Sequence, residues 1–423
     1  MSNKAPEPVA KPRRDVASVV AKQRIMPLAY WRPLAGGAER DETVFLEAMV
    51  AHFGPETRAI PIGRARSGFH LLTQAAISEG RRKVLMSSYT IPDVVKMVTL
   101  AGGEPVFYDF EPDATAASLD SLSRLIDCET ACVVVTHYHV NEVRLAEIAA
   151  LCRAHGARLF DDCAIAFGGV LDGAPIGVHT DASVFSSSSF KLLNYFWGGL
   201  VTTRDEALAE RIARVVESWP RLRARDYAPQ AKACARYDFA SRPLAFRTLV
   251  FPMLQRRLKA ATSTRGLEHV RVESISLDAT LTSRPAMAAF AEWREKLGQV
   301  DQWVERRRAI AAIYRRRLAA HMVGRDTPGP ILAGSCFTNF PILAPAERRG
   351  AVVRELILRG FDVGANLYPN TQRQPGFTEI AGESANVDRL VAASLYLPTH
   401  FGVSEDYAEA LAEETRALLD NAA

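Results

Sequence analysis

Short apolar runs alternate with amphipathic stretches over about residues 42–205. Six runs have the length and composition of buried strands: KVLM at 83–86, EPVFY at 104–108, CVVVT at 132–136, ARLF at 157–160, ASVF at 182–185 and GLVTT at 199–203. Between them, segments such as 91–101 and 144–155 place apolar residues at helical spacing. This alternation predicts an α/β domain with a mainly parallel sheet covered by helices on both faces.

The pattern changes after residue 206. We predict a helix over 206–218, an irregular Arg-rich stretch over 219–281 and a long helical segment over 285–320. A strand near 336–343, a helix over 346–359, a strand over 361–367 and a closing helix over 404–421 follow. The chain is therefore expected to have three parts: an N-terminal arm and lead-in (1–40), a large α/β domain with a basic insert at about 220–281 (41–281), and a long helix with a smaller C-terminal α/β domain (282–423).

The insert contains the stretch PLAFRTLVFPMLQRRLK at 243–259, which mixes large apolar and cationic residues. Such a composition fits a helix lying on a membrane surface or beside a lipid-linked substrate. The alternative is a helix packed on its own domain or on a partner subunit. The interruption by Pro252 favours this alternative.

Composition and charge exclude several classes of protein. Among 423 residues, 52 Lys and Arg against 48 Asp and Glu leave a net charge of +4, too small a bias to indicate nucleic acid as a partner. The six cysteines include no CxxC pair or zinc-ligand spacing, so no metal site is expected. The first 15 residues lack the apolar core of a signal peptide, and no run of 18 apolar residues occurs. We expect a cytoplasmic protein.

One extended segment and one predicted strand lead into residues suited to binding. PIGRARSGFHLL at 61–72 indicates an extended segment that turns through glycines into a helix, and a helix N-terminus suits a phosphate. THYH at 136–139 ends an apolar strand, and His137 and His139 are expected to share a face. A metal pair is conceivable, but no third ligand has a suitable spacing. We therefore expect these histidines to line a site through hydrogen bonds.

An acid pair and a lysine are the strongest candidates for chemistry. Asp161 and Asp162 end the strand in LFDDCAIAFGG at 159–169, where open α/β sheets place their ligands, and their side chains must point to opposite faces. Such an acid binds a metal, a ribose or a protonated ring nitrogen, or caps a turn. Lys191, one of only nine lysines, follows four serines in DASVFSSSSFK at 181–191. It is either a surface lysine or an amine nucleophile of lowered pKa.

In their order along the chain, these features resemble the DegT-like family of PLP-dependent sugar aminotransferases. The resemblance rests on the glycine turn, Tyr89-Thr90 after a strand, the acid pair, and a serine-rich loop with lysine before WGGLVTT at 197–203. RPAMAAF at 284–290, RRAIAAIY at 307–314, GANLYP at 364–369 and SLYLPTH at 394–400 extend it over roughly 40–215 and 282–421. It implies PLP fold type I, an aspartate-aminotransferase-like α/β fold whose large domain has a mainly parallel, seven-stranded sheet, with a smaller C-terminal domain.

By this resemblance, Lys191 would form a Schiff base with pyridoxal 5'-phosphate and Asp162 would contact its pyridine nitrogen. A buried carboxylate keeps the proton on that nitrogen, which the electron-sink chemistry of the cofactor requires. The resemblance also implies a larger set of contacts. The phosphate would meet Ser186, Arg66 and Ser67, the ring would lie near Tyr89, Ile91 and Ile165, and substrate would meet His137, Tyr138, Asn366 and Tyr368.

The chain departs from the family pattern at several of these positions. Ile91 stands where the family usually stacks an aromatic residue on the cofactor, and whether Tyr89 compensates for it stays open. Ile165 replaces a His or Gln, Leu192 replaces an Asn after the lysine, and Ala65-Arg66 replaces a Gly-Thr turn. The lysine and the aspartate remain, so these departures leave an altered cofactor site as an open alternative.

The resemblance implies a homodimer that moves an amino group from an amino acid, with glutamate as the expected donor, to a keto sugar. A nucleotide-linked acceptor is expected, in the biosynthesis of amino sugars or surface polysaccharides. Two alternatives stay open. One is another PLP reaction on the same fold, although dehydratases of the family replace the lysine by His. The other is a catalytically silent scaffold or regulator that binds a membrane or a partner through the insert.

Overall fold

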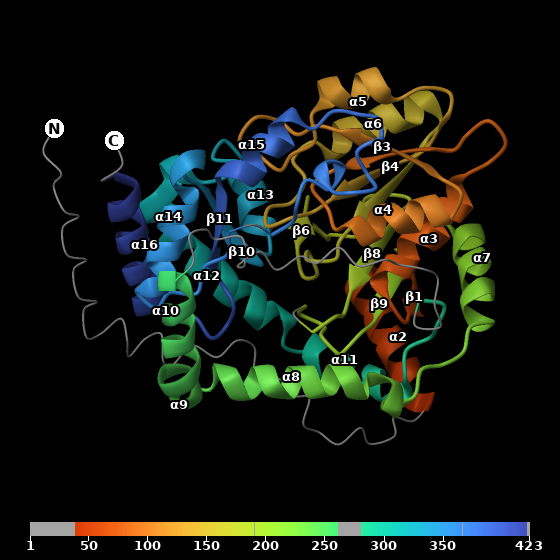
Figure 1. Ribbon diagram of the computed structural model, residues 1–423. Coiled ribbons are helices and arrows are strands. Elements are labelled where there is room, and N and C mark those ends of the chain that lie inside the picture. The colour runs from red at the N-terminus through yellow and green to blue at the C-terminus, as the bar shows by residue number, and fades with distance from the viewer. Residues whose placement is uncertain (1–38, 190, 261–280, 366, 421–423) are drawn as a thin grey trace, which may run out of the picture.

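The computed structural model describes residues 39–189, 191–260, 281–365 and 367–420, so most of the predicted N-terminal arm lies outside the described residues. Two α/β parts lie side by side, a large one around a seven-stranded sheet and a smaller one around a two-stranded sheet (Figure 1). The predicted α/β fold with a mainly parallel sheet is confirmed.

The large sheet has the strand order β1-β9-β8-β5-β4-β2-β3. All six predicted runs form strands in it, and the seventh is β1, which leads into the glycine turn. Neighbours from β3 to β8 are parallel, whereas β9 is antiparallel to both β8 and β1. The strands are β1 (Arg58–Ile62), β2 (Lys83–Ser87), β3 (Glu104–Tyr108), β4 (Thr130–Thr136), β5 (Arg158–Asp162), β8 (Ala182–Ser186) and β9 (Gly199–Thr203).

Helices cover both faces of this sheet because its strands are apolar on both sides. In β4, Cys132 and Val134 face one core, while Val133 and Val135 face the other. The first core is closed by α3 (Ala65–Ala76), α4 (Pro92–Leu100) and α7 (Glu206–Glu217). The second is closed by α2 (Glu39–Phe53), α5 (Leu119–Leu125), α6 (Leu145–His155) and α11 (Met287–Leu297).

The smaller part pairs β10 (Asn339–Leu343) with β11 (Ser394–Pro398) in antiparallel register. Around this pair lie α12 (Val300–Leu318), α14 (Ala346–Leu358) and α16 (Glu405–Asp420). The strand predicted over 361–367 is wrong, because this segment pairs with β11 only through a single bridge from Gly364 to Tyr396. Phe361, Val363 and Ala365 alternate with other residues as in a strand, and all three are buried although the segment is not a strand.

The helical segment predicted over 285–320 is divided into α11 and α12. Phe290 and Trp293 of α11 pack into the core of the large part, whereas Ile310 and Tyr314 of α12 pack into the smaller one. The chain thus passes from one part to the other between these helices. Apart from the helices of the insert, the remaining elements are β6 (Val170–Leu171), β7 (Ala174–Pro175), α13 (Gly329–Gly334), α15 (Ala385–Ala393) and the short helices η2 (Ala224–Tyr227), η4 (Ala319–His321) and η5 (Thr371–Arg373).

The insert forms a row of helices along one edge of the molecule (Figure 1). It comprises α8 (Ala228–Ser241), α9 (Pro243–Ala245), the π-helical η3 (Phe246–Val250) and α10 (Phe251–Ala260). Gln255 donates a side-chain hydrogen bond to the Leu358 carbonyl (3.2 Å), and Arg354 donates one to the Leu258 carbonyl (3.1 Å). One side of α10 therefore packs on α14 of the same chain, while residues 261–280 lie outside the described part.

Pro252 does not end the helical path of the insert, because it is the second residue of α10, which directly follows the π-helical turn. Among the described residues, no helix combines the length and the apolar character that crossing a bilayer requires.

Candidate active site

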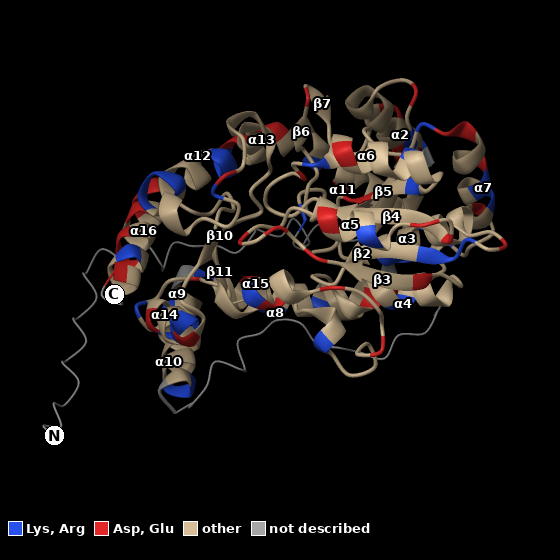
Figure 2. Cartoon of the chain, turned by 90° about the horizontal axis from the view of Figure 1, so that it is seen from above, with Lys and Arg blue, Asp and Glu red and all other residues tan. Residues whose placement is uncertain are grey.

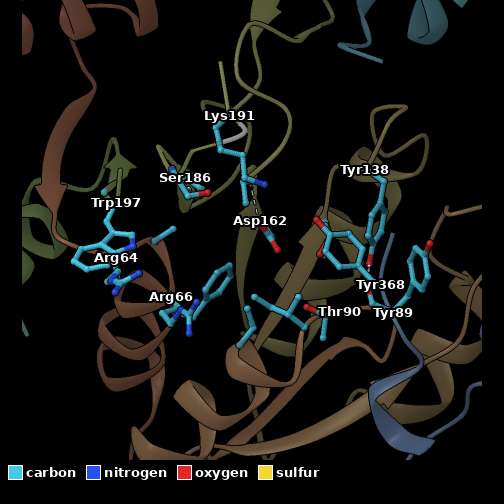
Figure 3. Close-up of a pocket in the computed structure, with 18 residues that line it drawn as sticks. Arg64, Arg66, Tyr89, Thr90, Tyr138, Asp162, Ser186, Lys191, Trp197 and Tyr368 are labelled. Atoms are coloured by element: carbon cyan, nitrogen blue, oxygen red, sulfur yellow. Dashed lines mark hydrogen bonds between the residues drawn. The ribbon is translucent and has the colours of Figure 1, made fainter. Parts of the chain in front are cut away.

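A cavity of about 190 Å³ opens at the carboxyl ends of β4, β5 and β8, beside the start of α3. Lys191 and Asp162 both line it (Figure 3). Ligand sites of open α/β sheets lie at these strand ends. Its wall consists of Arg64, Ala65, Arg66, Phe69, Tyr89, Thr90, Ile91, Val94, Thr136, Tyr138, Asp162, Ala164, Ser186, Ser188, Lys191, Trp197, Gly198 and Tyr368.

Lys191 lies on the loop that joins β8 to β9. The ends of this loop are tied together, because the N–H of Ser187 donates to the Gly198 carbonyl (3.1 Å) and the N–H of Tyr195 donates to the Ser187 carbonyl (2.8 Å). Gln230 of the insert donates a hydrogen bond to the Ser189 hydroxyl at 3.1 Å. Helix α8 of the insert thus contacts the loop two residues before Lys191.

Asp162 is the last residue of β5, and only 8% of it is exposed. The N–H of Ala164 donates to Asp162 Oδ1 at 2.9 Å, which fixes the carboxylate on the cavity wall. Burial raises the pKa of Asp162 to about 6, although the Ala164 hydrogen bond and the charge of Lys191 oppose the shift. Near neutral pH this carboxyl group is still ionised and can hold a cationic partner.

Burial lowers the pKa of Lys191 to about 8, and the cation of Arg307 acts in the same direction. The carboxylate of Asp162 opposes the shift. Relative to an ordinary lysine pKa of 10.5, the neutral amine is roughly 300-fold more abundant at neutral pH. The amine can therefore act as a nucleophile and carry a proton.

The two acids of β5 point to different sides of the sheet, as the sequence predicts. Asp161 is buried away from the cavity, with Oδ1 lying 3.3 Å from His137 Nε2. Burial alone would lower the pKa of His137, but the carboxylates of Asp161, Glu142 and Asp162 together raise it above its ordinary value, with Asp161 contributing most. The His137–Asp161 pair thus links the residue after β4 to the end of β5, outside the cavity wall.

His137 and His139 have different partners and neither lines the cavity. Strand β4 ends at Thr136, so the two-residue repeat that predicts a shared face no longer applies to them. The His139 ring lies against Tyr396, with centroids 4.8 Å apart, and burial together with Arg307 and Lys191 lowers the pKa of His139 to about 3. The expectation that both histidines line the site is not met.

One end of the cavity is cationic. Arg64 stacks on Trp197 with its guanidinium carbon 3.8 Å from the ring centroid, and Arg66 forms an ion pair with Asp93. Arg64 stands at the N-cap of α3 without a side-chain hydrogen bond to the helix, so the first-turn N–H groups of α3 have no side-chain cap. Ser186 belongs to the same end (Figure 3), and its hydroxyl lies 3.4 Å from that of Ser188. These groups suit an anion.

A glycine allows α3 to start this close to the sheet. A Cβ atom on Gly199, the first residue of β9, would lie 2.7 Å from Ala65 Cα and 2.8 Å from the Phe185 carbonyl oxygen. Real Cβ atoms do not approach backbone so closely. The second glycine of WGGLVTT therefore sets the position of the helix start.

The other end of the cavity is aromatic. Tyr89, Tyr138 and Tyr368 lie together on the far side of Asp162 from Trp197 (Figure 3). The Tyr138 hydroxyl donates to the Tyr89 carbonyl at 2.6 Å, and the hydroxyls of Tyr89 and Tyr396 are hydrogen-bonded. Tyrosines of this kind offer an apolar ring and a polar tip to a ligand.

The structure brings most of the predicted residues to one cavity. Those on the wall are Arg66, Tyr89, Ile91, Tyr138, Asp162, Ser186, Lys191 and Tyr368. Four predicted residues are not on it. The Ser67 hydroxyl donates to the Leu281 carbonyl (2.5 Å), and Ile165 is buried in the core. His137 pairs with Asp161, and His139 lies against Tyr396. Asn366 lies outside the described residues. The roles of the residues on the wall stay predictions.

Sequence reasoning gave no role to Arg64, Trp197 or Thr136. Trp197 had a usable signal, since it directly precedes the two glycines after the lysine loop. The contact of Arg64 with Trp197 joins residues far apart in the chain, and no local pattern predicts it.

One group of three potential metal ligands occurs in the described part of the chain. Ligand atoms of His137, Asp161 and Cys163 lie within 4.8 Å of one another, and all three residues are buried. Burial raises the pKa of the Cys163 thiol well above its ordinary value, and Asp161 already pairs with His137. A protonated thiol is a poor metal ligand, so we do not assign a metal site to these three residues.

Comparison with protein families gives one match. The model of the DegT/DnrJ/EryC1/StrS aminotransferase family matches residues 38–227 and 286–416. The match covers most of the chain and both sides of the cavity. It leaves out residues 228–285, which contain the helices of the insert.

Curated relatives and solved structures agree with this match. The chain is 29% identical over 231 residues to the "Pleiotropic regulatory protein" of Geobacillus stearothermophilus, covering 53% of this chain but only 60% of that protein. It is 23% identical over 346 residues to the "dTDP-4-dehydro-2,3,6-trideoxy-D-glucose 4-aminotransferase" of Saccharopolyspora spinosa, covering 80% and 78%. The crystal structure of aminotransferase TlmJ from Streptoalloteichus hindustanus has the same fold, with a TM-score of 0.70, 22% identity and coverage of 95% and 98%.

Proposed function

Because this chain belongs to the DegT/DnrJ/EryC1/StrS aminotransferase family, we propose that it is a PLP-dependent aminotransferase that aminates a keto sugar. The expected amino donor is glutamate, and the expected acceptor is linked to a nucleotide. One observation carries the proposal: a lysine of lowered pKa and a buried aspartate line the same cavity.

The residues of the cavity fit pyridoxal 5'-phosphate. Asp162 and Lys191 supply a carboxylate and an amine in the middle of the cavity, and the uncapped start of α3 with Ser186 and Ser188 supplies donors for a phosphate at its cationic end. When bound, the cofactor supplies a protonated pyridine ring that withdraws electrons from the bond being broken. Asp162 holds the proton on that ring, because its carboxyl group is ionised at neutral pH.

Lys191 has two tasks in this proposal. Its neutral amine is the attachment point of the cofactor, and once released by the incoming donor amine it moves a proton at the reacting carbon. The lowered pKa serves both tasks, since the amine must lose and regain a proton near neutral pH. The tied ends of its loop hold the backbone of Lys191 in place during these transfers.

The aromatic end of the cavity is the proposed sugar site. Tyr89, Tyr138 and Tyr368 offer ring faces and edges to a sugar, and the buried hydroxyls offer polar contacts. Ile91 lines the cavity without an aromatic face, so stacking on the cofactor ring falls to another residue of the wall. We propose that the enzyme acts as a homodimer in the cytoplasm.

Reconstitution with PLP and glutamate tests the proposal. The purified protein is expected to gain a visible absorbance band with PLP and to lose it when glutamate is added. Lys191→Ala should abolish the band, whereas Lys232→Ala, a change at an exposed lysine of α8, should leave it intact. A wild-type protein that stays colourless with excess PLP would overturn the proposal.

A second candidate function is a silent relative that regulates or scaffolds. Two observations favour it: Ile91 and Ile165 stand where the family carries cofactor-contacting side chains, and one relative is named a "Pleiotropic regulatory protein". The same experiment separates the candidates, since a protein that binds no PLP cannot transfer an amino group in the proposed way.

A further inference from the structure

The arm of the insert, defined here as residues 242–260, exposes apolar side chains. Eight large hydrophobic residues are exposed in the described part of the chain, and five of them lie between Tyr237 and Met253. Within the arm, Leu244, Leu249 and Met253 are 75%, 62% and 55% exposed. Contiguous exposed apolar residues indicate a surface that binds something.

These side chains are not needed to hold the arm on the body. Leu258 is buried, and Phe246 and Leu254 pack beside it against the core of the smaller part. Leu254 and Leu258 are four residues apart and form the inner stripe of α10, whereas Leu249, Met253 and the exposed Arg257 form a second stripe at the same spacing. The arm therefore has one face on the protein and another in solvent.

The charge of the arm has a single sign. It contains Arg242, Arg247, Arg256, Arg257 and Lys259, and no Asp or Glu occurs from residue 239 to residue 260. Helix α10 accordingly carries blue but no red segments, whereas α12 and α16 carry both (Figure 2). At the base of the arm, Arg242 meets Asp238 of α8 at 3.5 Å. No salt bridge is found for Arg247, Arg256 or Arg257 within the described part of the chain.

From these features we propose that the arm docks on an anionic phospholipid surface. Exposed apolar side chains beside a run of cations are what an interfacial helix presents to acyl chains and lipid headgroups. A second copy of the chain is the less suitable occupant, because a twofold contact would set this cationic face against itself. The family match omits the arm, so the docking is a property of this chain and does not depend on the proposed activity.

Vesicle sedimentation tests the docking. The full-length protein should sediment with vesicles of phosphatidylglycerol and phosphatidylcholine in equal parts, and much less with phosphatidylcholine alone. Added salt should weaken the binding because headgroup attraction is screened. Arg256→Gln with Arg257→Gln should weaken it by roughly 30-fold, at about a fivefold factor per cation. Arg214→Gln, at an exposed arginine of α7, is the matched control and should change nothing.

The apolar contribution is tested separately. Leu249→Ser with Met253→Ser should weaken binding to the anionic vesicles at least tenfold, whereas Leu100→Ser, at an equally apolar exposed position on α4, should not. Lys191→Ala should bind vesicles as the wild type does, so the docking proposal and the proposed activity can be tested separately. Absence of binding to anionic vesicles at low salt would overturn the proposal. A Leu249→Ser and Met253→Ser variant that becomes monomeric by light scattering while the wild type is dimeric would also overturn it, because the face would then be an interface between copies.

Discussion

The guanidinium of Arg307, on α12, lowers the pKa of the Lys191 amine, which lies on the loop after β8. Arg307 is buried and donates a hydrogen bond to the Thr338 hydroxyl at 3.4 Å. It forms no ion pair in the described part of the chain. A buried cation without a carboxylate acts on every titratable group around it, and it also lowers the pKa of His139 and His400.

Arg307→Gln should raise the pKa of Lys191. At neutral pH the neutral amine should become on the order of threefold to tenfold scarcer, and PLP should attach correspondingly more slowly. The rate of appearance of the visible band, measured as a function of pH, should move to higher pH. Arg308→Gln is the control, since Arg308 binds the carbonyls of Gly334 and Ser335. An unshifted pH profile in Arg307→Gln would remove the electrostatic role.

Asp162→Asn should make the PLP-free protein more stable while lowering its activity. The folded pKa of about 6 lies above the ordinary 3.8, so the protonated form is favoured by folding. The wild type therefore loses stability as pH rises from about 4 to 6, and the loss is complete above this window. Asn mimics the protonated acid. At pH 7.5 the free energy of unfolding should be roughly 1–3 kcal/mol higher in the variant, and the difference should shrink toward pH 4.

Urea unfolding at several pH values measures this difference, and transfer from glutamate should fall at least about 100-fold in the same variant. Asp161→Asn is the contrasting change, because Asp161 pairs with buried His137 away from the cavity. It should lower stability by about 1–3 kcal/mol. Equal behaviour of the two variants would contradict the division of roles between the two acids.

Gly199→Ala should destabilise the protein and weaken PLP binding together. The added methyl group would meet the backbone of Ala65 at 2.7 Å, so either β9 or the start of α3 must move. Overpacking of this kind costs about 1–3 kcal/mol, measurable as a lower urea midpoint. Gly329→Ala is the matched control, because a Cβ there meets nothing within 4 Å. A Gly199→Ala protein with wild-type stability would show that the close approach is not fixed.

Trp197→Leu should weaken PLP binding without unfolding the protein. Arg64 stacks on Trp197 at the cationic end of the cavity, and loss of a stacked guanidinium costs about 0.5–2 kcal/mol. The dissociation constant of PLP should therefore rise between twofold and thirtyfold in a fluorescence titration. Trp303→Leu, which removes a ring stacked on Phe401 outside the cavity, should leave it unchanged.

The sequence predicts the fold where its signals are local. Apolar runs placed six of the seven sheet strands, and the divergence of Asp161 and Asp162 follows from the two-residue period of a strand. The same period fails at His137 because the strand ends one residue earlier. It also fails at 361–367, where alternating burial arises without strand pairing.

Site residues that belong to a sequence motif could be predicted, whereas residues that reach the site only through contacts between distant segments could not. Lys191 and Asp162 reach one cavity because Asp162 ends β5 and Lys191 lies on the loop after β8, and these parallel strands end at the same edge of the sheet. Ser67 and Ile165 stand at motif positions, yet their side chains turn into the protein. The partners of Arg64 and Arg307 depend on how distant segments pack, which no local spacing encodes.

The hydrogen bond from Gln230 to Ser189 joins the insert to the lysine loop, and α8 continues into the arm. The arm is thus linked, through one helix and one side-chain hydrogen bond, to a residue two positions before the reactive amine. If the arm docks on a bilayer as proposed, the loop that carries Lys191 is anchored through α8 to the part of the chain that rests on the membrane.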